Sequence, residues 1–204
     1  MKKVTMGFGL TKEHHDFFHR NHFIEFEDLL SSEETDPLER AAACAVTSRD
    51  WIRVGHDLWR RDTSVKKVTV HRGLAEIASS LCKKSPLRLA YDQVIEGSFS
   101  KDPLNLIEAS AIRKVVCGLT LQLNPTSSVE NPLVPKKRGA GVFFSPFYTL
   151  DFPKDCHLFM IVYTERLAQY VHETRAPNMH ALKKLDYVFG DRLRTTTHPL
   201  LARP

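Results

Sequence analysis

The stretch "LRLAYDQVIEGSFSKDPLNLIEAS", residues 87–110, opens with the pattern of a β-strand. Alternate side chains at its start fall on one face: Leu87, Leu89, Tyr91, Gln93 and Ile95. The residues between them face the other way, and a period of two is typical of a half-buried strand. After this strand the chain continues through Ser98, Ser100, Lys101 and Asp102 without a histidine.

Further strands are expected after residue 85. Three more apolar stretches follow: "VVCGLTLQL" (115–123), "GVFFSPFYTL" (141–150) and "HLFMIVYTE" (157–165). In the first of them one face carries Val115, Cys117, Leu119, Leu121 and Leu123. The segment 124–141, "NPTSSVENPLVPKKRGAG", is rich in proline, serine and glycine and is expected to be a loop.

The N-terminal part is expected to begin with a short helix and a strand. Thr11 can cap a helix that ends near Arg20, and "FIEFE" (23–27) then indicates a strand. A later helix is predicted because apolar residues recur at the spacing of one buried helix face: Leu74, Ile77, Ala78 and Leu81.

The long helix between these elements has two candidate starts. Ser31 with Glu34 can form a capping box, and Asp36 before Pro37 places a proline at a first helical position. Proline is poorly tolerated inside a helix, so we expect this helix to start at Pro37.

Helices before residue 85 and strands after it predict an α+β fold, a strand-rich sandwich or barrel backed by helices. One domain over residues 1–204 is expected at this length. Within it, we expect 1–85 to form mainly helical support, 86–165 the core strands and 166–204 a C-terminal extension.

Composition and charge favour a cytoplasmic protein without a strong preference for any partner. The chain carries 29 Lys and Arg against 24 Asp and Glu, a net charge of +5, which permits contact with nucleic acid without requiring it. Its four cysteines are far apart with no Cys-x-x-Cys pair, as in reduced intracellular proteins. The N-terminal apolar stretch is too short for a signal peptide, and no run of apolar residues is long enough to cross a bilayer.

Two segments carry a family resemblance: "LTKEHHDFFHRNHFIEFEDLLSSEETDPL" (10–38) and "GHDLWRRDTSVKKVTVHRGLAEIASSLCKKSPLRLAYDQ" (55–93). Their order and spacing resemble the opening half of phytanoyl-CoA dioxygenase-like proteins. The resemblance implies a double-stranded β-helix, a cupin-like jelly roll, with the N-terminal helices packed outside it. It also implies Fe(II) bound by two histidines and a carboxylate, 2-oxoglutarate as co-substrate, and an arginine for the far carboxylate of 2-oxoglutarate.

The sequence departs from that family at each site position. No histidine occurs between Arg72 and Cys156, and "SFSKDPLNLIEAS" (98–110) occupies the region of the family's His-x-Asp. Thr149 or Leu150 falls where the distal histidine belongs, and His157 stands near the position of the arginine. We therefore expect a degenerate member without iron or 2-oxoglutarate, which is not an enzyme. Tyr91, Gln93 and His157 are expected to line any residual pocket, although a filled core is the more common outcome in so short a barrel.

The N-terminal helix offers an alternative metal site. The sequence contains one His-x-Asp, His14–Asp16, and His15 and His19 stand one helical turn apart. A polar helix face that happens to hold histidines is the more common reading of such a pattern. In the same way, "PKKRGAG" (135–141) fits a basic loop tip better than a phosphate site.

The sequence leaves three functional hypotheses. The first is a non-catalytic relative of the oxygenases that binds or regulates through a small molecule or a protein. The second is a divalent-cation-responsive DNA-binding transcription regulator, which uses the N-terminal histidines and the basic groups. The third is an active oxygenase with relocated metal ligands.

Overall fold

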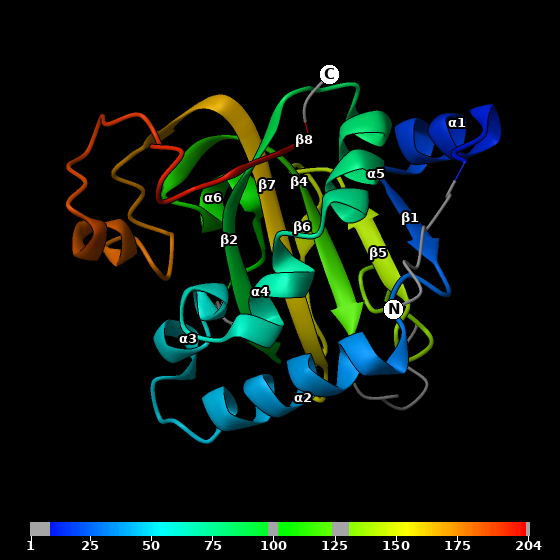
Figure 1. The fold of residues 1–204 in the computed structure, drawn as a ribbon, viewed down its shortest axis with the longest axis horizontal. Coiled ribbons are helices and arrows are strands. Elements are labelled where there is room, and N and C mark those ends of the chain that lie inside the picture. The colour runs from blue at the N-terminus through cyan, green and yellow to red at the C-terminus, as the bar shows by residue number, and fades with distance from the viewer. Residues whose placement is uncertain (1–8, 98–101, 124–130, 203–204) are drawn as a thin grey trace.

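The computed structural model describes residues 9–97, 102–123 and 131–202 (Figure 1). Most helices precede residue 85, and most strands follow it. The elements in chain order are α1 (Lys12–Asn21), β1 (Phe23–Phe26), α2 (Ser32–Val46), α3 (Trp51–Val54), η1 (Leu58–Arg60), α4 (Thr63–Thr69), α5 (Arg72–Cys82), β2 (Leu87–Glu96), β3 (Leu104–Asn105), α6 (Leu106–Ala109), β4 (Ile112–Gln122), β5 (Gly141–Phe144), β6 (Thr149–Leu150), β7 (His157–Tyr170), η2 (Ala181–Leu185) and β8 (Leu200–Ala202).

A curled antiparallel sheet forms the frame of the molecule. Its six strands lie in the order β1-β5-β4-β7-β2-β8, with the 14-residue β7 between β4 and β2. A second sheet has two strands, where Leu104 pairs with Leu150 and Asn105 with Thr149. We call the large sheet together with the β3–β6 pair the half-barrel. The half-barrel agrees with the expected mixture of helices and strands. Its strands form only part of the expected jelly roll.

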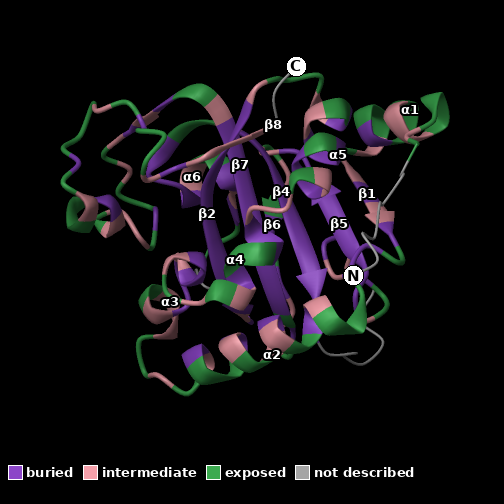
Figure 2. Cartoon of the chain, viewed as in Figure 1, coloured by how far each residue is buried: buried purple, intermediate pink, exposed green. Residues whose placement is uncertain are grey.

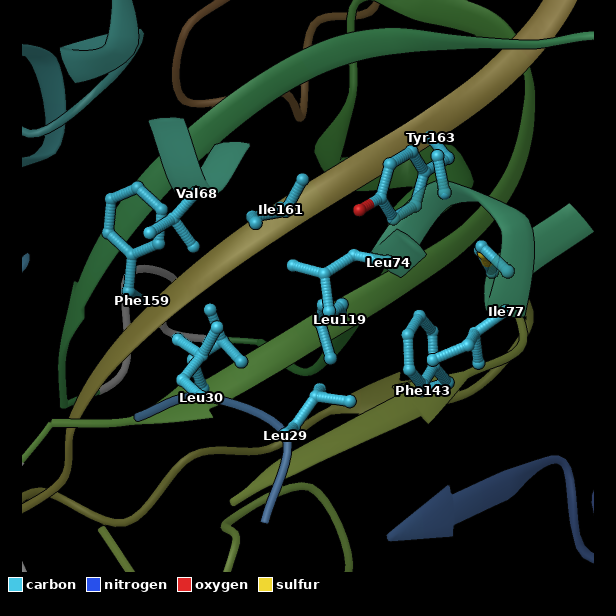
Figure 3. Close-up of a cluster of buried hydrophobic side chains, with 14 of the residues drawn as sticks. Leu29, Leu30, Val68, Leu74, Ile77, Leu119, Phe143, Phe159, Ile161 and Tyr163 are labelled. Carbon is cyan, nitrogen blue, oxygen red and sulfur yellow. The ribbon is translucent and has the colours of Figure 1, made fainter. Parts of the chain in front are cut away.

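Helices α2, α4 and α5 cover one face of the large sheet (Figure 1). Figure 3 shows the apolar layer between them, in which side chains of α4 and α5 meet those of the central strands. The four apolar residues predicted for one helix face are all buried: Leu74, Ile77, Ala78 and Leu81. Each fully buried leucine or isoleucine contributes about 1.5–3 kcal/mol, so this layer anchors the helices to the sheet.

The opposite face of the sheet looks into the half-barrel. A second apolar cluster fills much of it, with Val142 and Phe144 from β5, and Leu158, Met160 and Val162 from β7. Figure 2 shows the central strands as buried along nearly their whole length. The prediction of a half-buried strand at 87–95 is therefore wrong, because helices cover one face and the half-barrel interior the other; even Arg88 and Asp92 are buried.

A β-bulge changes which residues of β2 share a face. The register with β7 shifts between Leu89 and Tyr91. As a result Leu87 and Leu89 pack against the helices, while Tyr91 and Ile95 belong to the interior cluster. The strict alternation expected from the sequence fails here because a bulge inserts one unpaired residue and exchanges the faces of the residues after it.

The start of α2 also differs from expectation. The helix begins at Ser32, and Pro37 lies inside it. Ser31 N donates to Glu34 Oε2 at 2.9 Å, so the capping box stabilises the early turns. The predicted start at Pro37 is wrong because this cap outweighs the single hydrogen bond that the proline removes. By contrast, Thr11 does cap α1, as predicted.

The segment after β7 returns across the molecule. It forms η2 and then β8, which adds to the free edge of β2 with Leu87 opposite Ala202. On the way, Asn178 and Pro177 come to lie beside β2 and the α3–η1 turn. Among the described residues no helix is both long and apolar enough to span a membrane. Residues 1–8, in the stretch that the sequence analysis judged too short for a signal peptide, and residues 124–130 of the expected loop lie outside the described residues.

Candidate active site: a polar cavity and a basic groove

A small cavity, mostly apolar but with several polar side chains in its wall, lies between β2 and the C-terminal segment. Tyr91 and Gln93 reach it from β2, His56 from the turn before η1, Ser110 from the end of α6, and Asn178 from the C-terminal segment. Its volume is about 20 Å³, which is close to that of a single enclosed water. These residues are far apart in sequence, so packing of the C-terminal segment creates the cavity.

Close contacts fix the geometry of the cavity wall. The ring of His56 stacks on that of Tyr91, with 5.0 Å between centroids and 25° between planes. Gln93 Nε2 donates to the carbonyl of Ile52 at 3.1 Å, and its Oε1 accepts from Asn178 Nδ2 at 2.9 Å. The side-chain amides are thus held, and the imidazole and the phenol face the same space.

Burial decides the charge state of these groups. It lowers the pKa of His56, and the cations Arg60, Lys184 and Arg61 lower it further, against the opposing effect of Asp57. Burial likewise raises the pKa of Tyr91 above its ordinary value, against a hydrogen bond with Ser110. At neutral pH the site therefore presents a neutral imidazole and a protonated phenol, which are a proton acceptor and a hydrogen-bond donor.

A larger groove adjoins the cavity. The groove has a volume of about 520 Å³ and shares His56, Pro177 and Asn178 with the cavity. One wall is the α3–η1 region with Arg53, Asp57, Arg60 and Arg61, and the other is the C-terminal segment around η2 with His180 and Lys184. We call it the basic groove.

A buried carboxyl positions the α3–η1 wall. Asp92 on β2 accepts from the backbone N–H groups of Leu58 at 2.7 Å and Trp59 at 3.0 Å. Burial, together with the nearby charge of Asp57, raises the pKa of Asp92 to about 8. The side chain lies on the helix side of β2, while its neighbours Tyr91 and Gln93 face the cavity. Residues 91–93 of β2 therefore position the α3–η1 wall on one face and line the cavity on the other.

A second network ties the same wall to the C-terminal segment. Arg60 Nη1 donates to the carbonyl of Thr197 at 2.6 Å, and its Nε donates to Asp57 Oδ2 at 2.9 Å. His198 is fully buried beside Arg60 and Tyr187, and burial lowers its pKa to about 3. Arg60 is therefore committed to the fold, and the remaining cations of the groove face solvent.

Of the residues predicted for a residual pocket, the structure brings two together. Tyr91 and Gln93 line the cavity, whereas His157 lies at the start of β7 and pairs through Nδ1 with Glu96. His157 borders a different hollow, next to α2. His56 and Asn178 were missed, since a lone histidine in "GHDLW" and an asparagine 85 residues beyond Gln93 carry no pattern.

The N-terminal histidines are separated by their contacts. His14 Nδ1 accepts from Thr11 N at 3.1 Å and completes the cap of α1. His15 Nε2 lies 3.4 Å from the hydroxyl of Ser80 on α5, and the ring of His19 contacts that of Phe18. Neither these residues and Asp16 nor any other three His, Cys, Asp or Glu of the described chain gather as a metal-binding group.

The basic loop also makes specific contacts. Lys137 pairs with Glu27 at 2.5 Å, and Arg138 pairs with Asp36 at 2.5 Å and Glu39 at 2.8 Å. These contacts hold the loop to α2 and to the turn after β1.

The segments in which the resemblance places metal ligands, 98–110 and Thr149 or Leu150, contribute apolar side chains to the interior where they pair. The segments that carry them do lie side by side, because β3 pairs with β6. Leu104 and Leu150 are only 2% and 5% exposed and belong to the interior cluster. Asn105 Oδ1 caps α6 by accepting from Ile107 N at 2.9 Å and Glu108 N at 3.1 Å. Residues 98–101 of this region lie outside the described residues.

Comparison with known proteins places the fold. No protein-family model and no curated protein matches the sequence significantly. Among solved structures, SnoK, a non-heme α-ketoglutarate-dependent carbocyclase from nogalamycin biosynthesis, has a TM-score of 0.70 at 13% identity, over 95% of this chain and 97% of SnoK. The epimerase SnoN in complex with Fe3+, α-ketoglutarate and nogalamycin RO has a TM-score of 0.66 at 16% identity, over 92% of this chain and 97% of SnoN.

A third neighbour comes from a different system. EctD from S. alaskensis, with 2-oxoglutarate and 5-hydroxyectoine, has a TM-score of 0.58 at 12% identity, over 77% of each chain. The chain therefore has the fold of iron- and 2-oxoglutarate-dependent oxygenases, as the resemblance of its first half implied.

The comparison contradicts two expectations. We expected a protein that is not an enzyme and has no cofactor, yet its neighbours SnoK and SnoN are described as a carbocyclase and an epimerase, and SnoN and EctD have been solved with iron or 2-oxoglutarate. The described residues of the segments expected to carry the metal ligands nevertheless do not fit iron, since the paired Leu104, Asn105 and Leu150 offer no imidazole or carboxylate, and no three His, Cys, Asp or Glu of the described chain gather as a metal-binding group. A group of buried polar side chains lies instead around His56, with Tyr91, Gln93 and Ser110.

Proposed function

We propose that the chain is an enzyme with a fold related to the phytanoyl-CoA dioxygenase-like proteins, and that it acts on a small organic carbonyl compound in the cavity and basic groove. The observation that carries the proposal is the neutral His56 next to the protonated Tyr91 at the inner end of a groove large enough for a small molecule. Grooves of roughly 300–1,000 Å³ are typical of such sites.

These side chains suit proton transfer. His56 can accept a proton from the carbon next to a carbonyl, and Asp57 Oδ2, 3.8 Å from His56 Nδ1, would stabilise the imidazolium that results. The hydroxyl of Tyr91 can donate to the carbonyl oxygen as negative charge develops there. The amides of Gln93 and Asn178, fixed against each other, would orient the substrate.

2-Oxoglutarate is the first compound to test, because it is a keto acid and SnoN and EctD bind it. Proton NMR in D2O follows exchange of its C3 protons in one sample without metal. A second sample with Fe(II), ascorbate and oxygen follows formation of succinate. We expect the protein to accelerate the exchange in the sample without metal; succinate formation without exchange would indicate bound iron and would count against His56 as the base.

The variant His56→Gln should lower the rate about 100-fold, as expected for loss of a general base. The control His157→Gln removes a histidine that is paired with Glu96 away from the cavity, and it should keep the rate. Absence of both reactions, or equal rates in the two variants, would overturn the proposal.

A further inference from the structure

The volumes of the cavity and of the basic groove indicate which part of a substrate each can hold. The cavity around His56 holds little more than one water, whereas the groove outside it has about 520 Å³. A substrate must therefore place its body in the groove and only its reacting end at His56. The walls of the groove then determine which substrate class fits.

The α3–η1 wall is positively charged. Three arginines line this wall (Arg53, Arg60 and Arg61), and Lys184 faces them from η2, against a single lining carboxylate, that of Asp57, which already pairs with Arg60. Arg53 pairs with Asp50 at 2.5 Å, but that pair is largely exposed, and exposed ion pairs contribute little. Arg53, Arg61 and Lys184 are thus placed to contact a ligand.

The opposite wall is mostly apolar. Apart from Asn178, His180 and Lys184, the C-terminal segment presents Ala176, Pro177, Met179, Ala181 and Leu185 to the groove. An inorganic ion would leave this surface without a partner. An organic body joined to a charged group would contact both walls.

We infer that the basic groove binds the oxyanion, a carboxylate or a phosphate, of an organic substrate whose body packs on the apolar wall. This inference rests on the proposed function and names its substrate class. Arginine and lysine bind both oxyanions through charge-assisted hydrogen bonds, so the experiment has to separate them.

The groove also acts on the catalytic histidine. Burial is the largest cause of the lowered pKa of His56, and Arg60, Lys184 and Arg61 lower it further. A bound oxyanion would offset the effect of these cations, so the pKa of His56 would rise, although burial would still hold it below its ordinary value. Binding would thereby make the imidazole a stronger base when substrate is present.

Adjacent lysines of η2 provide a matched pair of variants. Lys184 lines the groove, whereas Lys183 is exposed and lies over the ring of Phe189, with 5.4 Å to the centroid. Calorimetric titration with succinate, inorganic phosphate and neutral succinamide compares wild type, Lys184→Glu and Lys183→Glu. We expect one of the anions, and not succinamide, to bind wild type, and Lys184→Glu to weaken it at least about tenfold.

The remaining results separate the two proposals. Lys183→Glu should stay within about twofold of wild type, since Lys183 does not line the groove. Equal losses in both variants, or no anion binding in wild type, would overturn the inference. Anion binding sensitive to Lys184 without any turnover of 2-oxoglutarate would uphold the groove and count against the catalytic role of His56.

Discussion

Two regions of the half-barrel interior differ in what fills them. Where β3 pairs with β6, Leu104 and Leu150 pack into the apolar cluster. Between β2 and the C-terminal segment, the same interior holds His56, Tyr91 and Gln93 around a cavity. The first region contributes stability but offers no group for chemistry, whereas the second also presents polar groups that can take part in chemistry. Substitutions in the apolar region should therefore change mainly stability, and substitutions around the cavity should change mainly ligand binding.

The largest effect is expected in the apolar region. Leu150→Ala removes a buried side chain and leaves a cavity, so it should lower the free energy of unfolding by about 2–5 kcal/mol. Urea denaturation measures it, and 2-oxoglutarate binding at 25 °C should not change. The control Ile107→Ala, at a residue that is 44% exposed, should cost less than about 0.5 kcal/mol. A strong effect of Leu150→Ala on 2-oxoglutarate binding would show that the two regions are not independent.

The next effect is a pH dependence from Asp92. Its pKa in the folded protein, about 8, lies above the ordinary value near 3.8 because the group is buried. The folded state therefore favours the protonated form, and this contribution to stability is fully present below about pH 4 and is lost as the pH rises through 8. The free energy of unfolding, measured with urea at pH 5, 6, 7 and 8, should fall.

Asp92→Asn cannot titrate and should flatten that slope, whatever it does to the stability at one pH. His198 works in the opposite direction: its lowered pKa, about 3, gives stability above pH 6.5 that is lost as the pH falls toward 3. The two contributions can be separated by comparing the alkaline and acid ends of the plot of unfolding free energy against pH. An unchanged slope in Asp92→Asn would show that this carboxyl is ionised in the fold.

A smaller effect is expected for Tyr91→Phe in the polar region. The change removes one hydroxyl that interacts with Ser110, so stability should fall by about 1 kcal/mol or less. Turnover or binding of 2-oxoglutarate should fall more, because the hydroxyl also serves the substrate. If stability and ligand binding fall in proportion, Tyr91 is only a packing residue.

Tyr163→Phe is the matched change on the helix side of the sheet. The hydroxyl of Tyr163 is buried with no hydrogen-bond partner among the described residues. Removing it should leave ligand binding unchanged and raise the free energy of unfolding by up to about 1 kcal/mol, since a buried unpaired hydroxyl is costly. A lower free energy of unfolding for Tyr163→Phe would instead indicate that the hydroxyl has a hydrogen-bond partner in solution.

Local features of the fold were predictable where one short-range force dominates. The cap at Thr11, the buried face of α5 and the strands β2 and β4 follow from neighbouring residues, and the structure contains each of them. The start of α2 was misjudged because two local forces compete there, the Ser31–Glu34 cap and Pro37. The bulge after Leu89 could not be foreseen, since it depends on the register with β7, about 70 residues away.

The candidate site was predictable only in part. Tyr91 and Gln93 were identified through their place on the strand, whereas His157 was assigned to the same pocket and lies elsewhere. The histidine that the site does contain, His56, precedes β2 by more than 30 residues and gave no periodic signal. Lys184 and Asn178 belong to a segment that has neither a clear helix nor a clear strand pattern.

The sequence by itself determined the order of helices and strands, the apolar faces that join them and a resemblance to oxygenases, because these depend on spacing along the chain. Only the tertiary structure decided that Leu104 meets Leu150, and that His56, Tyr91 and Asn178 surround one cavity beneath a basic groove. The reason is physical: a site forms from side chains that packing brings together from distant segments, and no local pattern records which segments will meet.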